Sequence, residues 1–560
     1  MKPIKKWNYF AWQNRVPNLS DAFFLAGTML FATLVVYGIF DLDLWVNAGS
    51  FLLVGLSFFL YAILMLVARE WRGVLHLCFF VWTALLGFDV WLRTFLKITY
   101  GVPAESPMVL QSLANTQSDE FREGFLHTAP WIFVCIFVAV AWFALAQLLT
   151  WNLFARSRRL ERLLGTPKIY LRVLAVAGTI LLFAIHFIPN LRMANPVALW
   201  VDHLLAFNEW KKQTANFHSD GNVAGDRILA WSPRFFGDQP RTVVLVIGES
   251  TNRNNWSLYG YERKTTPYLE ALNARGELLV FRDVLAGGAS TVPALRRMLT
   301  LAEMRDESKF LVEPDVLQLA HAAGYKIFWL SNQNDTYIRN LFASSAQVAV
   351  FTNDGNADEV TLDEALLPAY QNALDDPTPL KLIVLHLMGA HPYYQARVPE
   401  RLQKSFVFDK ENPDSVEAAM LARGRFDWVI NARNDYDCAM IYQDELLKNL
   451  IEPLRSRENV NLLYVSDHAQ EVGHTRNFTG HDPNGIFGYT VPMVYWQNKV
   501  FSVKYKTLVE SRAFQTDMLF SALLNSVLQI KTQIAFPQND IFDAQNFRSR
   551  ERFYEYTDID

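Results

Sequence analysis

Hydrophobic and polar positions divide the chain into two parts of different character. Before about residue 195 the apolar residues form long, nearly unbroken runs, whereas after residue 240 short apolar runs alternate with polar and amphipathic stretches. A helix needs about 20 apolar residues to cross a bilayer. Five runs are long enough, and they predict an α-helical membrane domain with five transmembrane helices, at residues 21–40, 47–67, 74–94, 128–150 and 170–189.

The second part has the pattern of an α/β domain. Its strand-length runs are rich in Val, Ile and Leu, as expected of parallel strands buried on both faces; they lie at residues 242–247, 326–330, 382–387 and 461–466. Helical patterns lie between the runs, for example at residues 313–323 and 436–454. This alternation predicts an α/β fold with a mostly parallel central sheet.

Residues 191–240 connect the two parts. Within them, residues 197–212 are apolar on one face and carry paired tryptophans and adjacent lysines, which suits a helix lying in the bilayer interface. An ordinary packed helix is the alternative. Residues 221–240 contain several Gly, Pro and Asp and are interpreted as a linker. The predicted domains are therefore 1–190, 191–240 and 241–560.

The distribution of charge predicts how the chain is oriented in the membrane. Lys and Arg collect at the N-terminus, in the second loop and in the fourth loop, at Lys2, Lys5, Lys6, Arg15, Arg69, Arg72, Arg156, Arg158, Arg159, Arg162 and Lys168. Basic loops stay in the cytoplasm. Five crossings then place the domain after residue 190 on the opposite face, which in the inner membrane of a bacterium is the periplasm. The segment 41–45 is no signal cleavage site, so the first span is expected to be retained.

Overall composition narrows the function only a little. The formal net charge of −4 over 560 residues suggests no nucleic-acid partner. Of the three cysteines, Cys78 and Cys135 fall in predicted spans, so Cys438 has no partner for a disulfide within the soluble part.

Candidate chemistry lies just beyond the ends of the predicted strands, where parallel sheets bind their ligands. Five residues follow such ends, namely Glu249, Asn332, His391, Asp467 and His468. Carboxylate oxygens and imidazole nitrogens are good zinc ligands. Five of the eleven histidines follow residue 385, at His386, His391, His468, His474 and His481.

A hydroxyl nucleophile completes this set of candidate residues. Thr291 lies in the run GGASTVP at residues 287–293, directly after Ser290. An alcohol side chain is a poor nucleophile at neutral pH unless a base or a metal ion lowers its pKa. A threonine combined with Glu, Asp and His therefore indicates a metal-assisted transferase or hydrolase.

Four ordered motifs resemble those of the bacterial phosphoethanolamine transferases, which belong to the alkaline-phosphatase and sulfatase superfamily. They are the stretches GEST at 248–251, NWSLYGYERKTTPYL at 255–269, LHLMGAHPYY at 385–394 and VSDHAQEVGH at 465–474. The resemblance covers nearly the whole chain, because those enzymes carry five membrane spans before an alkaline-phosphatase-like periplasmic domain. It implies a fold of that kind here.

The resemblance also implies roles for individual residues. Glu249, Thr291, Asp467 and His468 would hold a catalytic zinc ion, and Thr291 would also be the nucleophile. Two further histidines, His391 and His481, fall where the family binds the phosphoryl group or a second zinc. His474 competes with His481 for that place, and Ser290 competes with Thr291.

The chain departs from the family pattern at two places. Lipid A modifiers often carry cysteines beside the nucleophile, where this chain has Gly287 and Arg297. The usual Asp-His-Gly-Glu is Asp-His-Ala-Gln here, and Glu471 follows one position later. The disulfide-poor pattern and the His-Pro-Tyr-Tyr run at residues 391–394 look more like the subgroup that modifies lipopolysaccharide core sugars.

The resemblance implies a transfer of phosphoethanolamine from phosphatidylethanolamine to lipopolysaccharide through a phosphoethanolamine-threonine intermediate. The enzymatic alternatives on the same scaffold are a phosphoglycerol transferase and a sulfatase-like or phosphatase-like hydrolase. A membrane-anchored binding protein with a structural metal is the alternative outside enzymes. Structural zinc sites are normally closed by four Cys or His ligands, which disfavours that last alternative.

Overall fold

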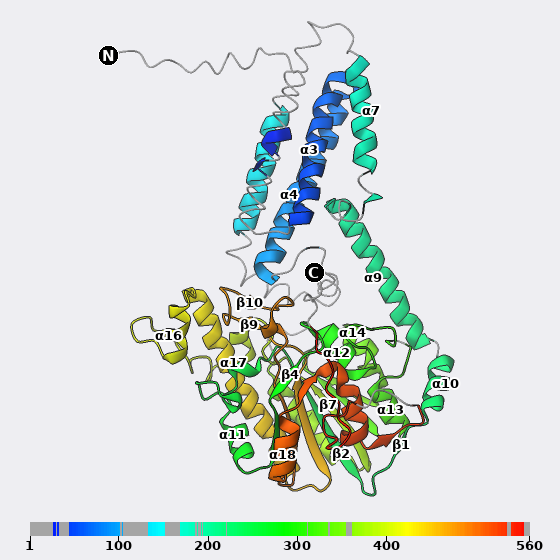
Figure 1. Cartoon of the computed structure of the whole chain (residues 1–560), viewed down its shortest axis with the longest axis vertical. Helices are drawn as coiled ribbons and strands as arrows, with labels where there is room; N and C mark the ends of the chain where they lie inside the picture. Colours follow the sequence, from blue (N-terminus) through cyan, green and yellow to red (C-terminus); the bar gives the residue numbers. More distant parts are fainter. Residues whose placement is uncertain are drawn as a thin grey trace. The chain divides into compact units, whose positions relative to one another are not determined.

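The computed structural model describes residues 26–29, 31–32, 44–100, 104, 133–151, 169–184, 187–188, 192, 194–219, 221–310, 312–333, 336–353, 361–534 and 539–553. These residues fall into two compact units. The first comprises Met1–Leu110 with Phe125–Trp210, and the second comprises Gln111–Gly124 with Lys211–Asp560. Figure 1 labels many of the helices and strands of both.

The first unit consists of apolar helices. The described helical segments are α3 (Leu44–Val67), η1 (Arg69–Trp71), α4 (Arg72–Tyr100), Phe133–Trp151, α7 (Ile169–Ala184) and the start of α9 (Pro196–Ser219). Among the described residues, three segments are long and apolar enough to cross a membrane: Gly49–Val67, Arg72–Leu96 and Phe133–Trp151. They coincide with the second, third and fourth predicted spans.

The other two predicted spans are not established. The first, at residues 21–40, lies mostly outside the described residues. The fifth, predicted at 170–189, falls on α7, which has 16 residues. The described helix is shorter than the roughly 20 residues that a helix needs to cross the hydrocarbon core, and the residues next to both of its ends lie outside the described part of the chain. The prediction of five transmembrane helices therefore stays a prediction.

Aromatic and aliphatic side chains together make the core of this unit. The Tyr61 and Phe79 rings stack with centroids 4.1 Å apart, and Phe58 and Trp142 are buried beside them. An ion pair is also buried here: the Arg93 side chain donates from Nε to Asp89 Oδ2 over 2.8 Å, and each side chain is 4% exposed. Ionisable groups in an apolar helix are held in this way by a partner of opposite charge.

The second unit is built on a mixed sheet of seven strands. In the described part of the chain their order is β3-β11-β8-β2-β7-β5-β6. The bounds are β2 (Arg241–Gly248), β3 (Leu278–Phe281), β5 (Lys326–Ser331), β6 (Val348–Phe351), β7 (Leu380–His386), β8 (Val460–Ser466) and β11 (Met493–Gln497). The five strands from β8 to β6 are parallel, and β11 runs antiparallel to both of its neighbours.

Three two-stranded pairs accompany the main sheet. They pair β1 (Arg234–Phe235) with β13 (Ile530–Lys531), β4 (Asp283–Leu285) with β12 (Ala513–Gln515), and β9 (Glu471–Val472) with β10 (Thr479–Gly480). The β9–β10 pair is antiparallel, and it bends the chain back on itself immediately after Asp467 and His468.

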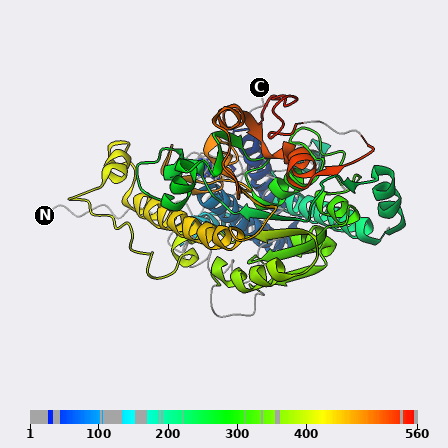
Figure 2. The same cartoon turned by 90° about the horizontal axis from the view of Figure 1, so that it is seen from below.

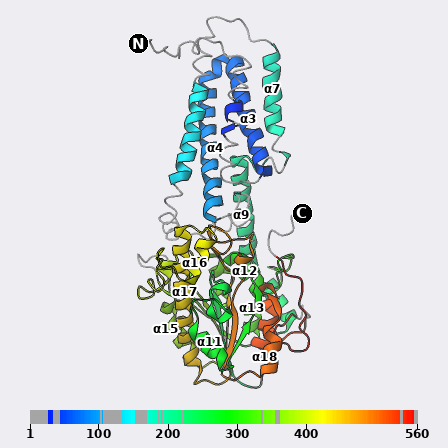
Figure 3. The ribbon, with the colours of Figure 1, turned by 60° about the vertical axis from the view of Figure 1, so that its left-hand side comes forward.

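Helices cover both faces of the sheet. Figures 1 and 3 place α11 and α17 on one side of the strands and α12 and α13 on the other. Figure 2 shows α17 as one continuous yellow helix alongside the strands. The helices are α10 (Gly221–Trp231), α11 (Pro267–Ala274), α12 (Thr291–Leu299), α13 (Val316–Ala322), α14 (Thr336–Leu341), α15 (Leu367–Asp375), α16 (Ser415–Ala422), α17 (Asp427–Ile451), α18 (Val503–Glu510) and α19 (Leu519–Ala522).

Burial on both faces explains why the central strands have continuous apolar sequences. Every residue of β8 is buried, as are the last six residues of β2. On one face, Val244 and Val246 pack into a cluster with Tyr436 and Leu450 of α17. Each strand therefore contributes apolar side chains in both directions, which is the pattern expected of a sheet between two helical layers.

The predicted α/β domain with a mostly parallel sheet is confirmed, with β11 as the antiparallel exception. All four predicted central strands are present as β2, β5, β7 and β8. The interpretation of residues 221–240 as a linker is wrong for its first half, because Gly221–Trp231 forms α10. Glycine lowers helix propensity without preventing a helix, and this segment contains no proline.

Candidate active site

Four parallel strands end at the same edge of the sheet, and their ends determine where the candidate residues lie. The register pairs Gly248 of β2 with Ser466 of β8, and it pairs His386 of β7 with Ile247 of β2 and Ser331 of β5. The residues that follow these ends must therefore lie side by side. These residues include Glu249 after β2, and Asp467 with His468 after β8.

Glu249, His468 and His481 form one compact group. One ligand atom from each lies within 4.8 Å of the other two. His468 Nε2 is 3.1 Å from Glu249 Oε1, and the His468 and His481 rings have centroids 4.7 Å apart. Glu249 and His468 are fully buried, whereas His481 is partly exposed. The group therefore combines a buried interior with one side open to a ligand.

Thr291 points its hydroxyl into this group. It is the first residue of α12, and its Oγ1 donates to Glu249 Oε2 over 2.9 Å and lies 3.4 Å from His468 Nε2. The close turn before the helix requires a glycine, because a Cβ on Gly288 would lie 3.0 Å from the Ala294 nitrogen. Ser290 is the N-cap residue, and its carbonyl accepts from Ala294 N. Of the two neighbouring candidates, Thr291 is thus the one whose hydroxyl contacts Glu249.

Asp467 lies beside the same group, and only one of its two carboxylate oxygens accepts hydrogen bonds from the described residues. Its Oδ1 accepts from the backbone nitrogens of Ser250, over 3.2 Å, and His468, over 2.6 Å. Its Oδ2 is buried, lies 3.5 Å from His468 Nε2, and finds no hydrogen-bond partner among the residues that the structure describes. A buried carboxylate oxygen without a donor is costly unless a cation or a ligand satisfies it.

The residues of the group strongly perturb one another's protonation. Burial would raise the pKa of Glu249, but the nearby His468 outweighs burial and holds that pKa well below its usual value. Burial and the Glu249 charge raise the pKa of Asp467 well above its usual value. Burial disfavours the protonated form of His468, but the charges of Asp467 and Glu249 outweigh burial and raise the pKa of His468 to about 9. The carboxylates therefore draw positive charge to the space between them, and the protonated His468 ring supplies it here.

The side chains present fit a zinc ion. Two carboxylates, one imidazole and one hydroxyl supply the oxygen and nitrogen donors that zinc takes in proteins. Asp467 Oδ2 and His391 Nδ1 are buried atoms for which the described residues offer no hydrogen bond. The residues that would hold a cation here are thus Glu249, Thr291, Asp467 and His468, with His481 adjacent.

His391 is carried to this edge by the loop after β7. Ala390 N donates to the Glu249 carbonyl over 3.0 Å, and a Cβ on Gly389, whose φ is +52°, would lie 2.6 Å from that same oxygen. Burial lowers the pKa of His391 to about 4, while the charge of Glu249 acts in the opposite direction. Burial also lowers the pKa of His481 well below its usual value. Both rings are therefore neutral at pH 7.

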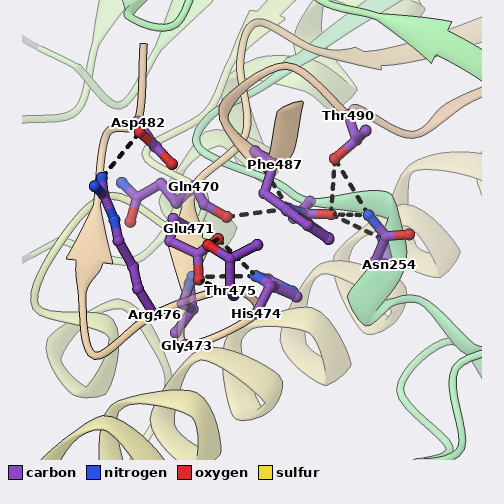
Figure 4. A network of polar contacts seen from close by, with 12 residues as sticks. Asn254, Gln470, Glu471, Gly473, His474, Thr475, Arg476, Asp482, Phe487 and Thr490 are labelled. Atoms are coloured by element: carbon purple, nitrogen blue, oxygen red, sulfur yellow. Dashed lines mark hydrogen bonds and ion pairs between the residues drawn. The ribbon is translucent and has the colours of Figure 1, made fainter. Parts of the chain in front are cut away.

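His474 lies outside this group, although its position in the sequence made it a candidate. Its Nε2 is 2.9 Å from Asn255 Oδ1, its Nδ1 accepts from Val472 N, and its ring stacks on Phe487 with centroids 4.5 Å apart. Figure 4 shows His474 among Glu471, Thr475 and Phe487. The structure therefore brings His481, and not His474, to Glu249.

Asn332 has a supporting position. Its amide nitrogen donates to Thr361 O and to Asp363 Oδ1, over 2.9 and 3.0 Å. Asp363 in turn accepts from the backbone nitrogens of Met388 and Gly389, over 2.7 and 2.9 Å. Asn332 thus braces the loop that carries His391.

Three residues at the site were not predicted from the sequence. The Ser250 hydroxyl donates to Glu249 Oε1 over 2.6 Å, the Gln333 amide donates to Glu249 Oε2 over 3.1 Å, and the Gln470 amide donates to the Ser250 hydroxyl over 2.8 Å. The only signal in the sequence was position, because each is within two residues of a predicted candidate.

Comparison with known proteins agrees with this geometry. The sulfatase family model matches residues 241–525. Phosphoethanolamine transferase EptC of Escherichia coli K12 is 32% identical over 332 residues, which cover 57% of this chain and 55% of that protein. Phosphoethanolamine transferase CptA of Salmonella typhimurium is 33% identical over 47% of this chain and 46% of its own length. The matched region thus spans about half the length of these relatives.

Solved structures show the same similarity. The C-terminal periplasmic domain of EptC from Escherichia coli, in complex with Zn, aligns with a TM-score of 0.52 and 29% identity over 57% of this chain and 91% of that domain. The integral membrane protein lipooligosaccharide phosphoethanolamine transferase A from Neisseria meningitidis aligns with a TM-score of 0.60 and 19% identity over 92% of this chain and 97% of that protein. At 19% identity, the second comparison shows a similar fold and nothing about function.

Proposed function

The chain belongs to the sulfatase family, and we propose that it is a zinc-dependent, membrane-embedded phosphoethanolamine transferase. The observation that carries this proposal is the contact of the Thr291 hydroxyl with Glu249, next to a buried Asp467 oxygen for which the described residues offer no donor. The names and the Zn complex of the relatives favour this transfer over the other reactions of the same scaffold.

In the first half of the reaction, Thr291 Oγ forms a bond to the phosphorus of phosphatidylethanolamine, and the bond from phosphorus to the glycerol oxygen breaks. Thr291 gives up its proton along its hydrogen bond to Glu249 Oε2. A neighbouring neutral histidine, for which His391 and His481 are the candidates, takes up this proton and then gives it, as an imidazolium, to the departing diacylglycerol oxygen. Zinc, when bound, would supply Lewis acidity to the hydroxyl and to the phosphoryl oxygens.

In the second half, an acceptor oxygen forms a bond to phosphorus and the bond to Thr291 breaks. The acceptor gives its proton to the neutral histidine, and the resulting imidazolium returns a proton to Thr291 by way of Glu249 Oε2. Burial keeps His391 and His481 neutral before each step, so each ring has an unprotonated nitrogen that can accept the proton. The α12 N-terminus at Thr291 adds backbone N–H groups that favour a phosphoryl anion.

Lipids labelled in the head group test the reaction class directly. Membranes that contain the protein should transfer labelled ethanolamine phosphate to lipopolysaccharide. Transfer of labelled glycerol phosphate would support a phosphoglycerol transferase, and release of the label to water would support a hydrolase. A protein that binds zinc but leaves every lipid intact would overturn the enzymatic proposal in favour of a structural metal.

A topology experiment tests the proposed location. We expect a reporter that is active only in the periplasm to work when fused after residue 225 and to fail when fused near Arg158, because basic loops remain in the cytoplasm. The same fusions to a cytoplasmic reporter are the control and should give the opposite result. The reverse pattern in both sets would contradict a periplasmic catalytic domain in the inner membrane.

The proposed acceptor is a lipopolysaccharide core sugar, or a phosphate on it, in preference to lipid A. It rests on the resemblance at residues 389–394 and on Gly287 and Arg297 where lipid A modifiers often carry cysteines. We expect mass spectra after mild acid hydrolysis to show the phosphoethanolamine increment on the core oligosaccharide. An increment confined to the lipid A fraction would contradict the acceptor alone.

A further inference from the structure

Ser250 and Gln470 belong to a buried chain of hydrogen bonds that ends on the Glu249 carboxylate. The Ser250 hydroxyl donates to Glu249 Oε1 over 2.6 Å, and Gln470 Nε2 donates to Ser250 Oγ over 2.8 Å. At the far end, the Tyr394 hydroxyl donates to Gln470 Oε1. Ser250, Gln470 and Glu249 are all fully buried, so water does not compete for these bonds.

The chain of donors has a direction. An amide nitrogen can only donate, and a serine hydroxyl carries a single proton. Because Gln470 donates to the Ser250 oxygen, the Ser250 proton is left for Glu249. Tyr394 occupies the amide oxygen of Gln470 and thereby keeps its nitrogen turned toward Ser250. Hydrogen bonds of an ionised carboxylate are stronger than those between neutral groups.

The Ser250 backbone links the same residue to the second carboxylate. Its φ is +59°, in the left-handed region that non-glycine residues rarely adopt. In this conformation Ser250 N donates to Asp467 Oδ1 over 3.2 Å, while the Ser250 carbonyl accepts from the Tyr436 hydroxyl over 2.6 Å. A strained conformation persists only where the surrounding contacts determine it, and such residues cluster at functional sites.

We propose that Ser250 and Gln470 are positioning residues that fix the two carboxylates of the metal site. Ser250 holds Glu249 through its hydroxyl and Asp467 through its backbone nitrogen, and Gln470 orients that hydroxyl. Glu249 Oε2 and Asp467 Oδ2 then stay directed toward Thr291 and His468. This inference rests on the proposed zinc-dependent function, because it concerns the ligands of that zinc.

Thr251, the residue after Ser250, is hydrogen-bonded to Gln443, and this pair supplies a matched control. Gln443 Nε2 donates to the Thr251 hydroxyl over 2.9 Å, and that hydroxyl lies 3.1 Å from the backbone carbonyl of Glu249. This pair is buried like Gln470 and Ser250, and it has the same amide-to-hydroxyl chemistry. It ends on the backbone and does not reach a carboxylate, so it can contribute to stability without orienting a ligand.

The test compares Ser250→Ala, Gln470→Met and Gln443→Met in the full-length protein, purified in detergent. Zinc affinity is measured by competition with a chromophoric chelator, alongside the thermal unfolding midpoint and the transfer rate. We expect Ser250→Ala and Gln470→Met to weaken zinc binding by about 10- to 100-fold, as for other residues that orient metal ligands. Gln443→Met should lower the unfolding midpoint and leave the zinc affinity unchanged.

The results separate this inference from the proposed function. If the unaltered protein neither binds zinc nor transfers phosphoethanolamine, the proposed function fails. If it does both, and Ser250→Ala and Gln470→Met bind zinc as tightly as it does, the positioning role alone is wrong. An equal loss of zinc affinity in all three variants would also overturn that role, because the loss would then follow from general destabilisation.

Discussion

Thr291→Ala is expected to reduce the transfer rate by about 10,000-fold or more, the scale seen when an enzyme loses its nucleophile. The substitution removes the hydroxyl that donates to Glu249 Oε2 and leaves α12 otherwise intact, because alanine is a good helix former. The protein should still fold and insert into the membrane. The measurement is transfer from a lipid labelled in its head group, with the far-UV circular dichroism spectrum as the check on folding.

Ser290→Ala is the matched control for this prediction, since Ser290 is the neighbouring hydroxyl at the N-cap of the same helix. It should retain most of the activity and most of the stability, because the Ser290 side chain makes no capping hydrogen bond to the helix. Peptide mapping of the trapped intermediate should place phosphoethanolamine on Thr291. An adduct on Ser290, or turnover without any covalent species, would contradict the assigned nucleophile.

Asp467→Ala is expected to lower zinc affinity by more than about 100-fold, beyond the range for residues that only orient ligands. The carboxyl group has a buried oxygen directed to His468 with no donor among the described residues, so the substitution removes an oxygen ligand from the proposed metal site. Turnover should fall together with zinc content. The measurement is zinc per protein by mass spectrometry after dialysis against a weak chelator.

His391→Ala provides the contrast to Asp467→Ala. His391 is placed by the loop at Gly389 and lies outside the group formed by Glu249, His468 and His481. We expect this variant to keep the first zinc ion while its transfer rate falls, because His391 is proposed to handle a proton and to bind the phosphoryl group. For Asp467→Ala, by contrast, a zinc content equal to that of the unaltered protein would argue against Asp467 as a zinc ligand.

Much of the site followed from a simple rule about parallel strands. The apolar runs at 242–247 and 461–466 predicted β2 and β8, and parallel neighbours end at the same edge of a sheet. The amino-acid sequence was therefore enough to expect Glu249, Asp467 and His468 to lie together. The prediction succeeds because a strand buried on both faces has a distinctive sequence, which local patterns reveal.

The supporting contacts could not be predicted in that way. Gln333 donates to Glu249 from 84 positions away, and Gln470 reaches Ser250 from 220 positions away. No local periodicity relates residues so far apart in the chain. The helix α10 was missed for a different reason: its glycines favour a linker on propensity alone, and propensity is a weak guide where the surrounding structure decides.

The histidines separate what the sequence determines from what only the tertiary structure decides. The sequence alone determines that a threonine, two carboxylates and several histidines follow the strand ends, because strand patterns and residue chemistry are local properties. It leaves His474 and His481 equivalent, since both follow Asp467 in one loop. The tertiary structure distinguishes them: antiparallel pairing of Glu471 with Gly480 folds the loop back, so that His481 returns to His468 while His474 turns to Asn255. That outcome depends on contacts between residues distant along the chain, since His474 meets Asn255 from 219 positions away, and no local pattern encodes such a contact.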